Sequence, residues 1–417
     1  MPMLSPPIEE DRALAEDAPI EPAPRRNRWS RSRVHRRRRR LLAGVAVVLA
    51  VCLIWAGVSL GSALTNPALG SSASARLAEW FREHGAASVV NWAENEWYSH
   101  HRPKVGGALP KGTIHQPVTT TTVPAAVVVS HLPAPAPIVP IASPSISGEG
   151  VWSPAGRLVD GVPAVYTTVL RPSAIHTSFV VGIAWMDTTL LKATLYSGSL
   201  IPGGGPYRHT APVSSSDATS LVAAFNAGFQ MSDANGGYYT DGKTIDPLRD
   251  GAASFVIYKN GSSTVGEWGR DVSMTPDVVS VRQNLDLLVD NGQVVPAAYN
   301  ASSSAWGATL GNADYVWRSA VGVTANGALV YVGGPGLDIV DLATILVRAG
   351  AVRAMELDIN TDWVNFSSYQ PSVPNGPATG ANGTELLPGM TGTPGRYFQP
   401  WWARDFITLS TSGTAVP

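Results

Sequence analysis

The sequence predicts an α+β fold of mostly antiparallel strands with a few packed helices, in one domain that follows a single transmembrane helix. Three observations predict this fold class. Charged residues make up only 15% of the 417-residue chain, whereas its 41 glycines and 33 prolines favour turns over long helices. One uncharged apolar run covers residues 41–64. From residue 150 onward, short apolar runs alternate with turn-forming residues, as is typical of antiparallel sheets.

Residues 1–40 are acidic and proline-rich at first and then strongly arginine-rich, which predicts a disordered cytoplasmic tail. Residues 41–64 are long enough to cross about 30 Å of hydrocarbon as a transmembrane helix. Arginines directly before a single span keep the N-terminus cytoplasmic and the rest of the chain extracytoplasmic. A cleaved signal peptide is the alternative. The long basic region and the lack of an Ala-x-Ala site after Leu60 favour an uncleaved anchor in the cell membrane.

The single cysteine, Cys52, excludes an intrachain disulfide and a cysteine-based metal site. Of the 30 lysines and arginines, 11 precede the apolar run, as do 6 of the 31 acidic residues. The remaining chain is therefore mildly acidic, which argues against a nucleic-acid partner. The expected partner of residues 41–64 is the lipid bilayer.

Two segments connect the span to the domain. Residues 73–101 carry apolar and tryptophan side chains at helical spacing, interrupted at Gly85. They predict a juxtamembrane helical segment at the membrane surface, with partner binding as the alternative. Residues 103–148 are rich in Pro, Thr and Val, which predicts an extended linker that cannot pack a core. At ~3.1 Å per residue, residues 113–147 would reach on the order of 100 Å.

Residues 150–417 predict the folded domain. Asn-Gly pairs at 260–261, 291–292 and 326–327 join apolar runs and predict β-hairpins. One helix is expected from about Ser216 to Ala224. Another is expected over 338–349, with Asp338 as N-cap and Gly350 after its end. Strands are expected at 164–170, 178–186, 190–198, 253–258, 263–268, 286–290, 317–324, 328–333, 351–359 and 405–410.

The stretch AVRAMELDIN, residues 351–360, has polar side chains where a buried strand normally carries Val or Ile. Alternate side chains of a strand share a face. The apolar face, expected to pack on the helix over 338–349, consists of Met355, Leu357 and Ile359. The opposite face ends in Glu356, Asp358 and Asn360. Two carboxyls at this spacing stand ~5 to ~9 Å apart, the range used by paired acids in glycoside hydrolysis. A strand end emerging into solvent explains the pattern equally well.

Two further stretches contain candidate site residues. In AAFNAGF, Asn226 lies between apolar neighbours and is followed by Gly228, which permits a close backbone approach. A buried Asn must be hydrogen-bonded, so Asn226 is either a structural bracket or a substrate contact. The next loop is rich in Gly, Asn and Asp, as site-lining loops are, and it includes Arg249. Arg318 opens an apolar strand; it either pairs with a carboxylate or presents a planar donor fork to a phosphate.

Several familiar motifs are absent from the sequence. It contains no Gly-x-Ser-x-Gly, no His-Glu-x-x-His and no Gly-x-x-x-x-Gly-Lys. These absences disfavour a Ser/His/Asp hydrolase, a zinc protease and a nucleotide-binding P-loop.

In this order, the three stretches resemble the phosphodiester glycosidase family, the family of the mannose-6-phosphate uncovering enzyme. The family's Asn-Gly-Gly-Phe, Arg-x-x-x-Gly and Leu-Asp-Gly-Gly-Gly-Ser motifs correspond here to NAGF at 226–229, RSAVG at 318–322 and LDIN at 357–360. The resemblance covers residues 170–410. The longer pattern, with GVWSP at 150–154, resembles the membrane-anchored actinobacterial branch. Ile359 and Asn360 stand where the family has glycines.

The resemblance implies a glycosidase, a hydrolase that cleaves a sugar-1-phosphodiester at the glycosidic side, on a glycan of the cell envelope. It transfers Asn226, Arg318 and Asp358 as site residues, and the strand alternation adds Glu356. We expect Asp358 to act as general base or nucleophile and Glu356 as its partner acid. Arg318, with Arg249, is expected to bind the phosphate.

The residues expected to bind substrate are Asn226, Gly228, Arg318, Arg249 and Asn360. No cofactor is expected, and Asp358, Asn360 and Asp362 leave open an oxygen-ligand site for a divalent metal. The alternatives to an enzyme are a non-catalytic binding module for phosphorylated wall glycans and a structural protein of the envelope.

Overall fold

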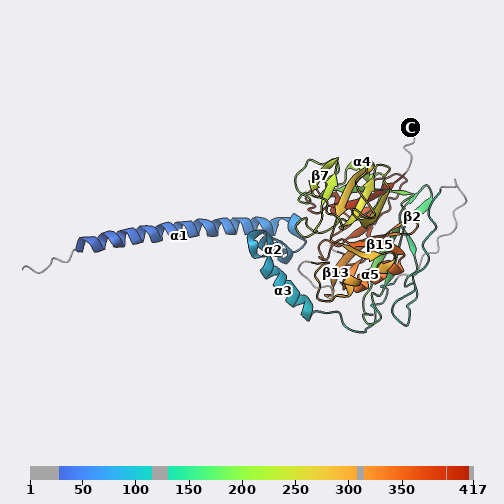
Figure 1. Ribbon diagram of the computed structural model, residues 1–417, viewed down its shortest axis with the longest axis horizontal. Helices are drawn as coiled ribbons and strands as arrows, with labels where there is room; N and C mark the ends of the chain where they lie inside the picture. The colour runs from blue at the N-terminus through green and yellow to red at the C-terminus, as the bar shows by residue number, and fades with distance from the viewer. Residues whose placement is uncertain (1–27, 115–129, 308–313, 391, 413–417) are drawn as a thin grey trace, which may run out of the picture. The chain divides into compact units, whose positions relative to one another are not determined.

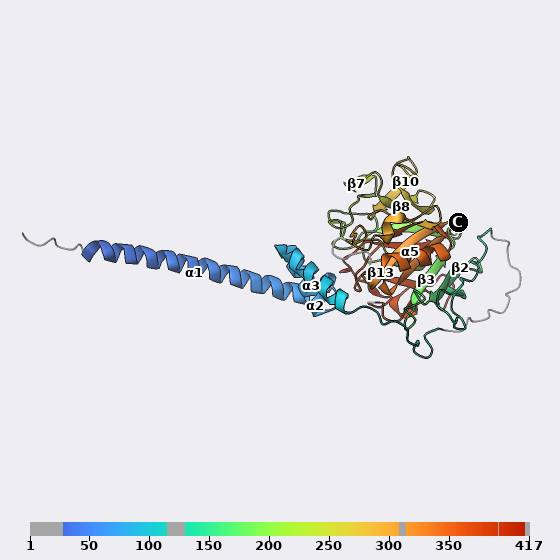
Figure 2. The same ribbon diagram turned by 60° about the horizontal axis from the view of Figure 1, so that its bottom comes forward.

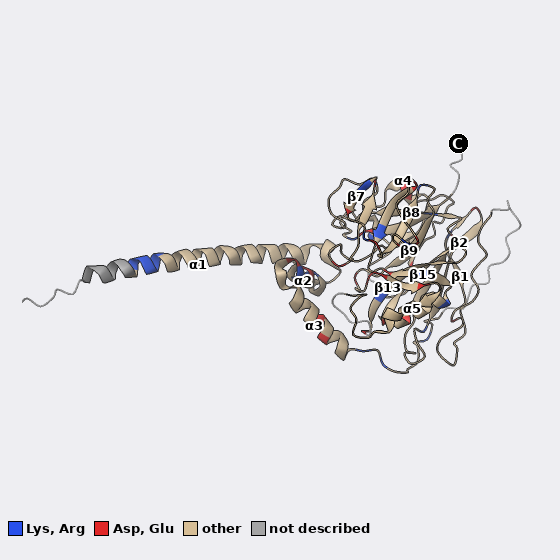
Figure 3. Cartoon of the chain, viewed as in Figure 1, with Lys and Arg blue, Asp and Glu red and all other residues tan. Residues whose placement is uncertain are grey.

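The computed structural model describes residues 28–114, 130–307, 314–390 and 392–412 of the chain (Figure 1). The chain divides into two compact units, Met1–Ser59 and Leu60–Pro417. Helix α1 (Arg28–Thr65) contains one stretch, His35–Thr65, that is long and apolar enough to cross a membrane, with a mean hydropathy of 2.7. Figure 3 shows arginines near the start of α1 and no charge along the remainder. This helix is a candidate transmembrane segment, and its length and composition fit an anchor and a signal sequence alike.

Two short helices follow α1 within the second unit. They are α2 (Ala73–Phe81) and α3 (Ala87–His100), preceded by the 3-10 turn Pro67–Leu69. The connection between α2 and α3 breaks the helical conformation at Gly85, whose φ of 82° suits glycine. The break expected from the sequence at Gly85 is therefore present.

Three sheets form the domain, and every strand pair that the structure describes within them is antiparallel. The large sheet has the order β1-β2-β3-β14-β13-β15-β11-β12. Its strands are β1 (Ser153–Val159), β2 (Val162–Leu170), β3 (Val181–Met186), β11 (Leu287–Asp290), β12 (Gln293–Val294), β13 (Val316–Thr324), β14 (Leu329–Leu337) and β15 (Ala351–Glu356).

The other two sheets have five strands each and are named here after a central strand. The β5 sheet, in the order β17-β16-β5-β18-β4, contains β4 (Leu191–Tyr196), β5 (Leu221–Asn226), β16 (Phe366–Tyr369), β17 (Gly383–Glu385) and β18 (Phe406–Thr411). The β8 sheet, in the order β7-β6-β10-β8-β9, contains β6 (Tyr238–Thr240), β7 (Lys243–Asp246), β8 (Ala253–Tyr258), β9 (Ser263–Glu267) and β10 (Val278–Gln283). The short helical turns are α4 (Ser215–Ala218), Pro296–Tyr299, Gly380–Asn382 and Arg396–Phe398.

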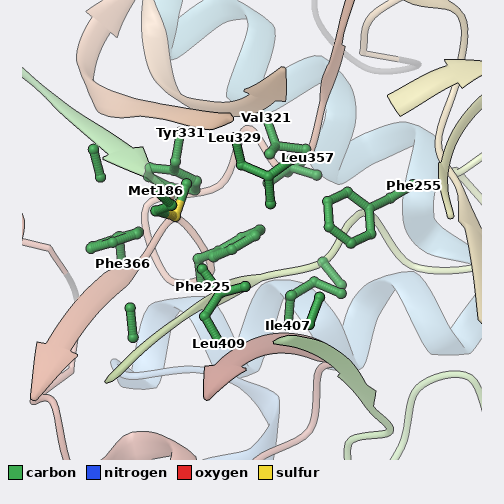
Figure 4. Packing of buried hydrophobic residues seen from close by; sticks show 14 of the residues in the cluster. Met186, Phe225, Phe255, Val321, Leu329, Tyr331, Leu357, Phe366, Ile407 and Leu409 are labelled. Atoms are coloured by element: carbon green, nitrogen blue, oxygen red, sulfur yellow. The ribbon is translucent and has the colours of Figure 1, made fainter. Parts of the chain in front are cut away.

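Side chains from all three sheets meet in one apolar core (Figure 4). Val321 comes from the large sheet, Phe225 from the β5 sheet and Phe255 from the β8 sheet, and all three are buried. The Phe225 and Phe255 rings meet edge to face, with centroids 6.3 Å apart. The central core therefore fixes the three sheets against one another.

Helix α5 (Ile339–Arg348) covers the opposite face of the large sheet, beside β13 in both ribbon views (Figures 1 and 2). The Asp338 side chain caps its start by accepting the N–H of Asp341 at 2.7 Å. Gly350 follows its end with a φ of 92°. The predicted helix and both of its boundaries are confirmed.

The prediction that the apolar face of β15 packs on helix α5 is wrong. Met355 and Leu357 point into the central core, whereas Ala354 lies in the second core beneath α5. Glu356 pairs in register with Ala320, which also faces α5. The alternation of faces was predicted correctly from Ala354 to Leu357 but fails at Ile359, which packs against the second core with Ala354. A period of two also does not reveal which neighbour covers which face.

Each predicted strand overlaps an observed one, and residues 253–258 coincide with β8. The three Asn-Gly pairs join β8 to β9, β11 to β12 and β13 to β14. The helix predicted from Ser216 to Ala224 is wrong beyond α4, because Leu221 already starts β5. Ala223 and Ala224 pair with β18 on one side and β16 on the other, so tertiary pairing overrides the helix propensity of alanine.

Part of the predicted linker lies against the domain. Ile138 and Ala142 are buried, and the Ile138 N–H donates to the Gly150 carbonyl at 2.9 Å. Nearer the helices, the Gly106 N–H donates to the Ile175 carbonyl at 2.7 Å. Residues 115–129 lie outside the described residues. The described parts of the linker thus differ from the expected free spacer, because their few apolar side chains join a core that other segments build.

Candidate functional site

The candidate site lies where the chain leaves strand β15. Beyond Glu356 the backbone still pairs with β13, because the Leu357 N–H donates to the Ser319 carbonyl and the Ser319 N–H to the Asp358 carbonyl, both at 2.8 Å. The Asp358 N–H also donates to the Ser319 hydroxyl at 3.2 Å. These bonds fix the position of Asp358 at the end of the strand.

Asp358 is a buried carboxyl that lines a pocket. The residue is 3% exposed, and its Oδ1 accepts the N–H of Asn360 at 2.9 Å. Burial raises the pKa of Asp358 to about 7, and the nearby positive charge of Arg404 opposes this shift. Asp358 can therefore exchange a proton near neutral pH, as a general base or acid requires.

Arg404, just before strand β18, is one of two arginines that line the pocket. It is 6% exposed and stacks on the Trp363 ring, with the guanidinium carbon 4.5 Å from the centroid. Its Nη1 is buried without a hydrogen-bond partner. An unsatisfied buried donor is costly. Arg404 therefore offers a free hydrogen-bond donor beside Asp358.

The pocket has one wall from outside the sheets. Glu79, Arg82, Glu94 and Tyr98 of the α2–α3 region line it opposite Asp358 and Arg404. Arg82 bridges Glu79 at 3.0 Å and Glu94 at 2.6 Å. The helices therefore present paired charges to the pocket.

Two side-chain hydrogen bonds help to hold the α2–α3 region and the segment before it against the domain. Gln230, in the loop after β5, donates to Glu79 at 2.8 Å, and the Ser71 hydroxyl donates to Asp362. With this wall in place the cavity measures about 80 Å³. Pockets for drug-sized ligands typically measure ~300–1,000 Å³. The pocket is thus closed in this state.

Glu356 and Arg318 lie behind the pocket and not in it. Both side chains are fully buried, and Arg318 Nη1 donates to Glu356 Oε1 at 2.8 Å. Arg318 also donates to the carbonyls of Leu337 and Trp306 at 3.0 Å. Burial raises the pKa of Glu356 to about 7, and the charge of Arg318 opposes the shift. The pair cross-links the β13 and β15 strands on the α5 side of the large sheet.

Asn226 is a structural bracket in this state. Its Nδ2 donates to the Ser319 hydroxyl at 3.0 Å. Its Oδ1 accepts the Tyr331 hydroxyl at 3.0 Å and the Asn365 N–H at 3.2 Å. Asn226 is therefore linked to Asp358 through the Ser319 hydroxyl, which accepts a hydrogen bond from the Asp358 backbone N–H.

Gly228 is required by close packing. A Cβ on it would stand 3.0 Å from the guanidinium carbon of Arg282, a fully buried side chain that pairs with Asp405 at 2.7 Å. Arg249 lies away from the pocket, partly exposed, where it pairs with Asp286 at 2.6 Å. Neither Gly228 nor Arg249 lines the pocket around Asp358.

Of the site residues expected from the sequence, the structure brings Asp358 and Asn360 into the pocket together. Ile359 lies between them on the pocket wall, in a position where the resembling family has glycine. Sequence reasoning missed Arg404 and the wall from α2 and α3. One available signal was Arg404 itself, a lone arginine among the aromatic and apolar residues of WWARDF.

Over the described residues, no group of three or more His, Cys, Asp or Glu side chains has the arrangement of a metal site. Asp233 is the fourth carboxyl of the pocket, and burial raises its pKa while Arg404 and Arg82 oppose the shift. The pocket thus combines four carboxyls with two arginines.

A comparison with known protein families matches one region of the chain. Residues 219–358, which include Asn226, Arg318 and Asp358, match the sequence model of the phosphodiester glycosidase family. No curated protein matches the chain.

Two solved structures are similar to this chain. One is the catalytic domain of the zebrafish N-acetylglucosamine-1-phosphodiester alpha-N-acetylglucosaminidase, auto-inhibited by its pro-peptide. It has a TM-score of 0.39 and 17% identity, over 63% of this chain and 88% of that chain. The other is a hypothetical protein from Synechocystis, with a TM-score of 0.33 and 13% identity, over 62% of this chain and 64% of that chain.

Proposed function

We propose that the chain belongs to the phosphodiester glycosidase family, whose sequence model matches residues 219–358, and that the pocket around Asp358 hydrolyses a sugar-1-phosphodiester at the glycosidic side. One observation supports this reaction most directly. A carboxyl with a pKa near neutrality shares the pocket with Arg404, whose buried Nη1 has no partner. A phosphate oxygen would supply the missing acceptor as a charge-assisted hydrogen bond.

The proposed reaction breaks the bond between the anomeric carbon and the phosphate oxygen. Ionised Asp358 accepts a proton from water, and the water oxygen bonds to the anomeric carbon. The electron pair of the broken bond leaves with the phosphate oxygen, which gives a phosphomonoester. Because this leaving group is weakly basic, it needs little protonation. Arg404 balances the charge that the phosphate gains.

A nucleophilic Asp358 breaks the same bond through a glycosyl ester, which water then hydrolyses. The two routes differ in the stereochemistry of the released sugar, because direct attack by water inverts the anomeric carbon and the two-step route retains it. Proton NMR of the sugar during the first minutes of hydrolysis separates them.

Arg318 and Glu356 were expected to bind phosphate and to act as an acid, but their burial favours a structural role. Both side chains are enclosed, and Arg318 is bonded to Glu356 and to backbone carbonyls. We assign phosphate binding to Arg404 and positioning of the β15 end to Arg318 and Glu356. Asn226 has the same positioning role through Ser319.

A sugar phosphodiester needs more room than the closed pocket of about 80 Å³ offers. Substrate entry therefore requires the α2–α3 wall to move away from Gln230 and Asp362. The contacts to be broken include two side-chain hydrogen bonds.

The proposed location is the outer side of a membrane, with α1 as the anchor and a glycan of the cell envelope as substrate. The apolar stretch His35–Thr65 and the arginines before it support this orientation. Protease added to intact cells should digest the domain and spare the N-terminal tail.

Hydrolysis in H₂¹⁸O tests the reaction. With the full chain and a synthetic α-sugar-1-phosphodiester, the label should enter the free sugar and not the phosphomonoester. Label in the phosphate would replace this proposal with a phosphodiesterase that attacks phosphorus. Saturable binding without release of sugar would favour the non-catalytic binding module.

A further inference from the structure

The α2–α3 region has an apolar outer face, formed by Phe81, Val89, Trp92 and Trp97. Three of these side chains are among the most exposed apolar residues of the second unit, with Val89 63%, Trp92 67% and Trp97 61% exposed. A groove between the two helices, lined mainly by apolar side chains such as Leu77 and Val90, adjoins them. The described residues of the domain leave this face uncovered.

A surface helix of a soluble domain normally turns its large apolar side chains inward. Here Glu79, Arg82 and Glu94 line the pocket, whereas Val89, Trp92 and Trp97 are exposed beside the exposed carboxyl of Glu96. Large apolar side chains mixed with charges on an exposed face suit a boundary between water and a second apolar environment outside the domain.

The chain itself indicates what that environment is. The candidate membrane span ends at Thr65, and Ser72 already caps α2. At no more than ~3.6 Å per residue, residues 66–72 hold the start of α2 within about 25 Å of the end of the span. Tryptophan is enriched where a membrane meets water, because its ring is apolar and its N–H remains hydrated.

We propose that the outer face of α2 and α3 binds the lipid bilayer, and that the same two helices thereby couple the membrane to the pocket wall on their inner face. The bilayer is the occupant because the span brings it to the helices without a second protein. A change in how the outer face lies in the bilayer moves Glu79 and Arg82, and with them the closure of the pocket. Only the reading of the pocket as a catalytic site rests on the proposed function.

Lipid contact is tested with the full chain in nanodiscs of phosphatidylcholine and phosphatidylglycerol. In a Cys52→Ser background, Val89→Cys is labelled with an environment-sensitive fluorophore, and spin-labelled lipid is added as quencher. Val373→Cys is the matched control, a valine of the domain with 59% exposure. We expect strong quenching at position 89 and at least fivefold less at position 373.

Equal quenching at the two positions overturns the inference. So does a blue-shifted label at position 89 that lipid does not quench, because that outcome indicates a second copy or another protein on the face. This experiment needs no catalysis, so it separates failure of the inference from failure of the proposed function.

The coupling is tested by hydrogen exchange in the same nanodiscs. Trp92→Ser with Trp97→Ser should speed the exchange of residues 229–233 and 358–363, which the inner face covers. Residues of β2 serve as the internal control, since they lie in the large sheet. Unchanged exchange at both pocket segments, with quenching at position 89 lost, would overturn the coupling.

Discussion

At the scale of single residues, Asp358 combines a reactive carboxyl with an unfavourable environment. Its carboxyl is almost fully buried, and burial raises its pKa to about 7 from an ordinary value near 4. The proposed base must be ionised. We therefore expect kcat/KM to rise about tenfold per pH unit below pH 7 and to level off above about pH 8. A rate that falls as the pH rises through 7 would assign Asp358 as a general acid instead.

The same pKa has a consequence for stability. Between about pH 4 and pH 7 the folded state holds a proton on Asp358 that the unfolded state releases, so this group loses stabilisation as the pH rises. Asp358→Asn should abolish turnover and should be more stable than the wild-type chain at pH 8, by up to about 4 kcal/mol. At pH 4 the two chains should have nearly equal stability. Denaturant unfolding at both values measures the difference, and an Asp358→Asn chain less stable at pH 8 would contradict the assigned pKa.

Arg404 carries the proposed phosphate contact. Arg404→Met should raise KM for a sugar-1-phosphodiester and lower kcat/KM by about 100-fold, because a charge-assisted hydrogen bond of ~1.5–3 kcal/mol is lost. Arg249→Met is the matched control, since Arg249 pairs with Asp286 and lies outside the pocket. Equal losses in the two variants would remove Arg404 from the site.

At the scale of elements, the buried Arg318–Glu356 pair joins β13 to β15. Arg318→Met leaves the buried Glu356 carboxyl without its counter-charge, so we expect a loss of about 3–5 kcal/mol in the free energy of unfolding. Arg270 forms an exposed ion pair with Asp290, and Asp290→Asn should cost less than about 1 kcal/mol. Thermal unfolding of the two variants makes the comparison. An Arg318→Met chain of wild-type stability would show that the pair is not needed for the fold.

The sequence predicted elements best where local chemistry is decisive. The Asn-Gly turns, the Asp338 cap and Gly350 each require a particular backbone conformation, and all were located correctly. The helix expected up to Ala224 failed because Leu221 to Asn226 fill the gap between β16 and β18. Nothing within that stretch reveals strands that come more than 130 residues later.

At the scale of the whole molecule, the α2–α3 wall lines the pocket, and we predict that it limits substrate entry. Ser71→Ala removes the hydrogen bond to Asp362 without altering a residue that lines the pocket. With about 1 kcal/mol of docking energy lost, kcat/KM should rise about fivefold. Ser88→Ala is the matched control, an exposed serine of α3. A rise in both variants, or in neither, would indicate that the wall does not limit entry.

The sequence alone determined the apolar span, the mostly antiparallel strand pattern of the domain and the location of Asp358 at a strand end, because each depends on residues close together in the chain. The motifs around Asn226, Arg318 and Asp358 identified the family region that the comparisons also match. Only the tertiary structure decided which of these residues reach the pocket. Arg318 points to the α5 side of the large sheet and is enclosed there by Glu356, whereas Arg404 arrives from the last strand of the β5 sheet. Which charged side chains meet depends on how the sheets pack. Packing brings Glu79 and Arg404 into one pocket, although more than 300 residues separate them along the chain.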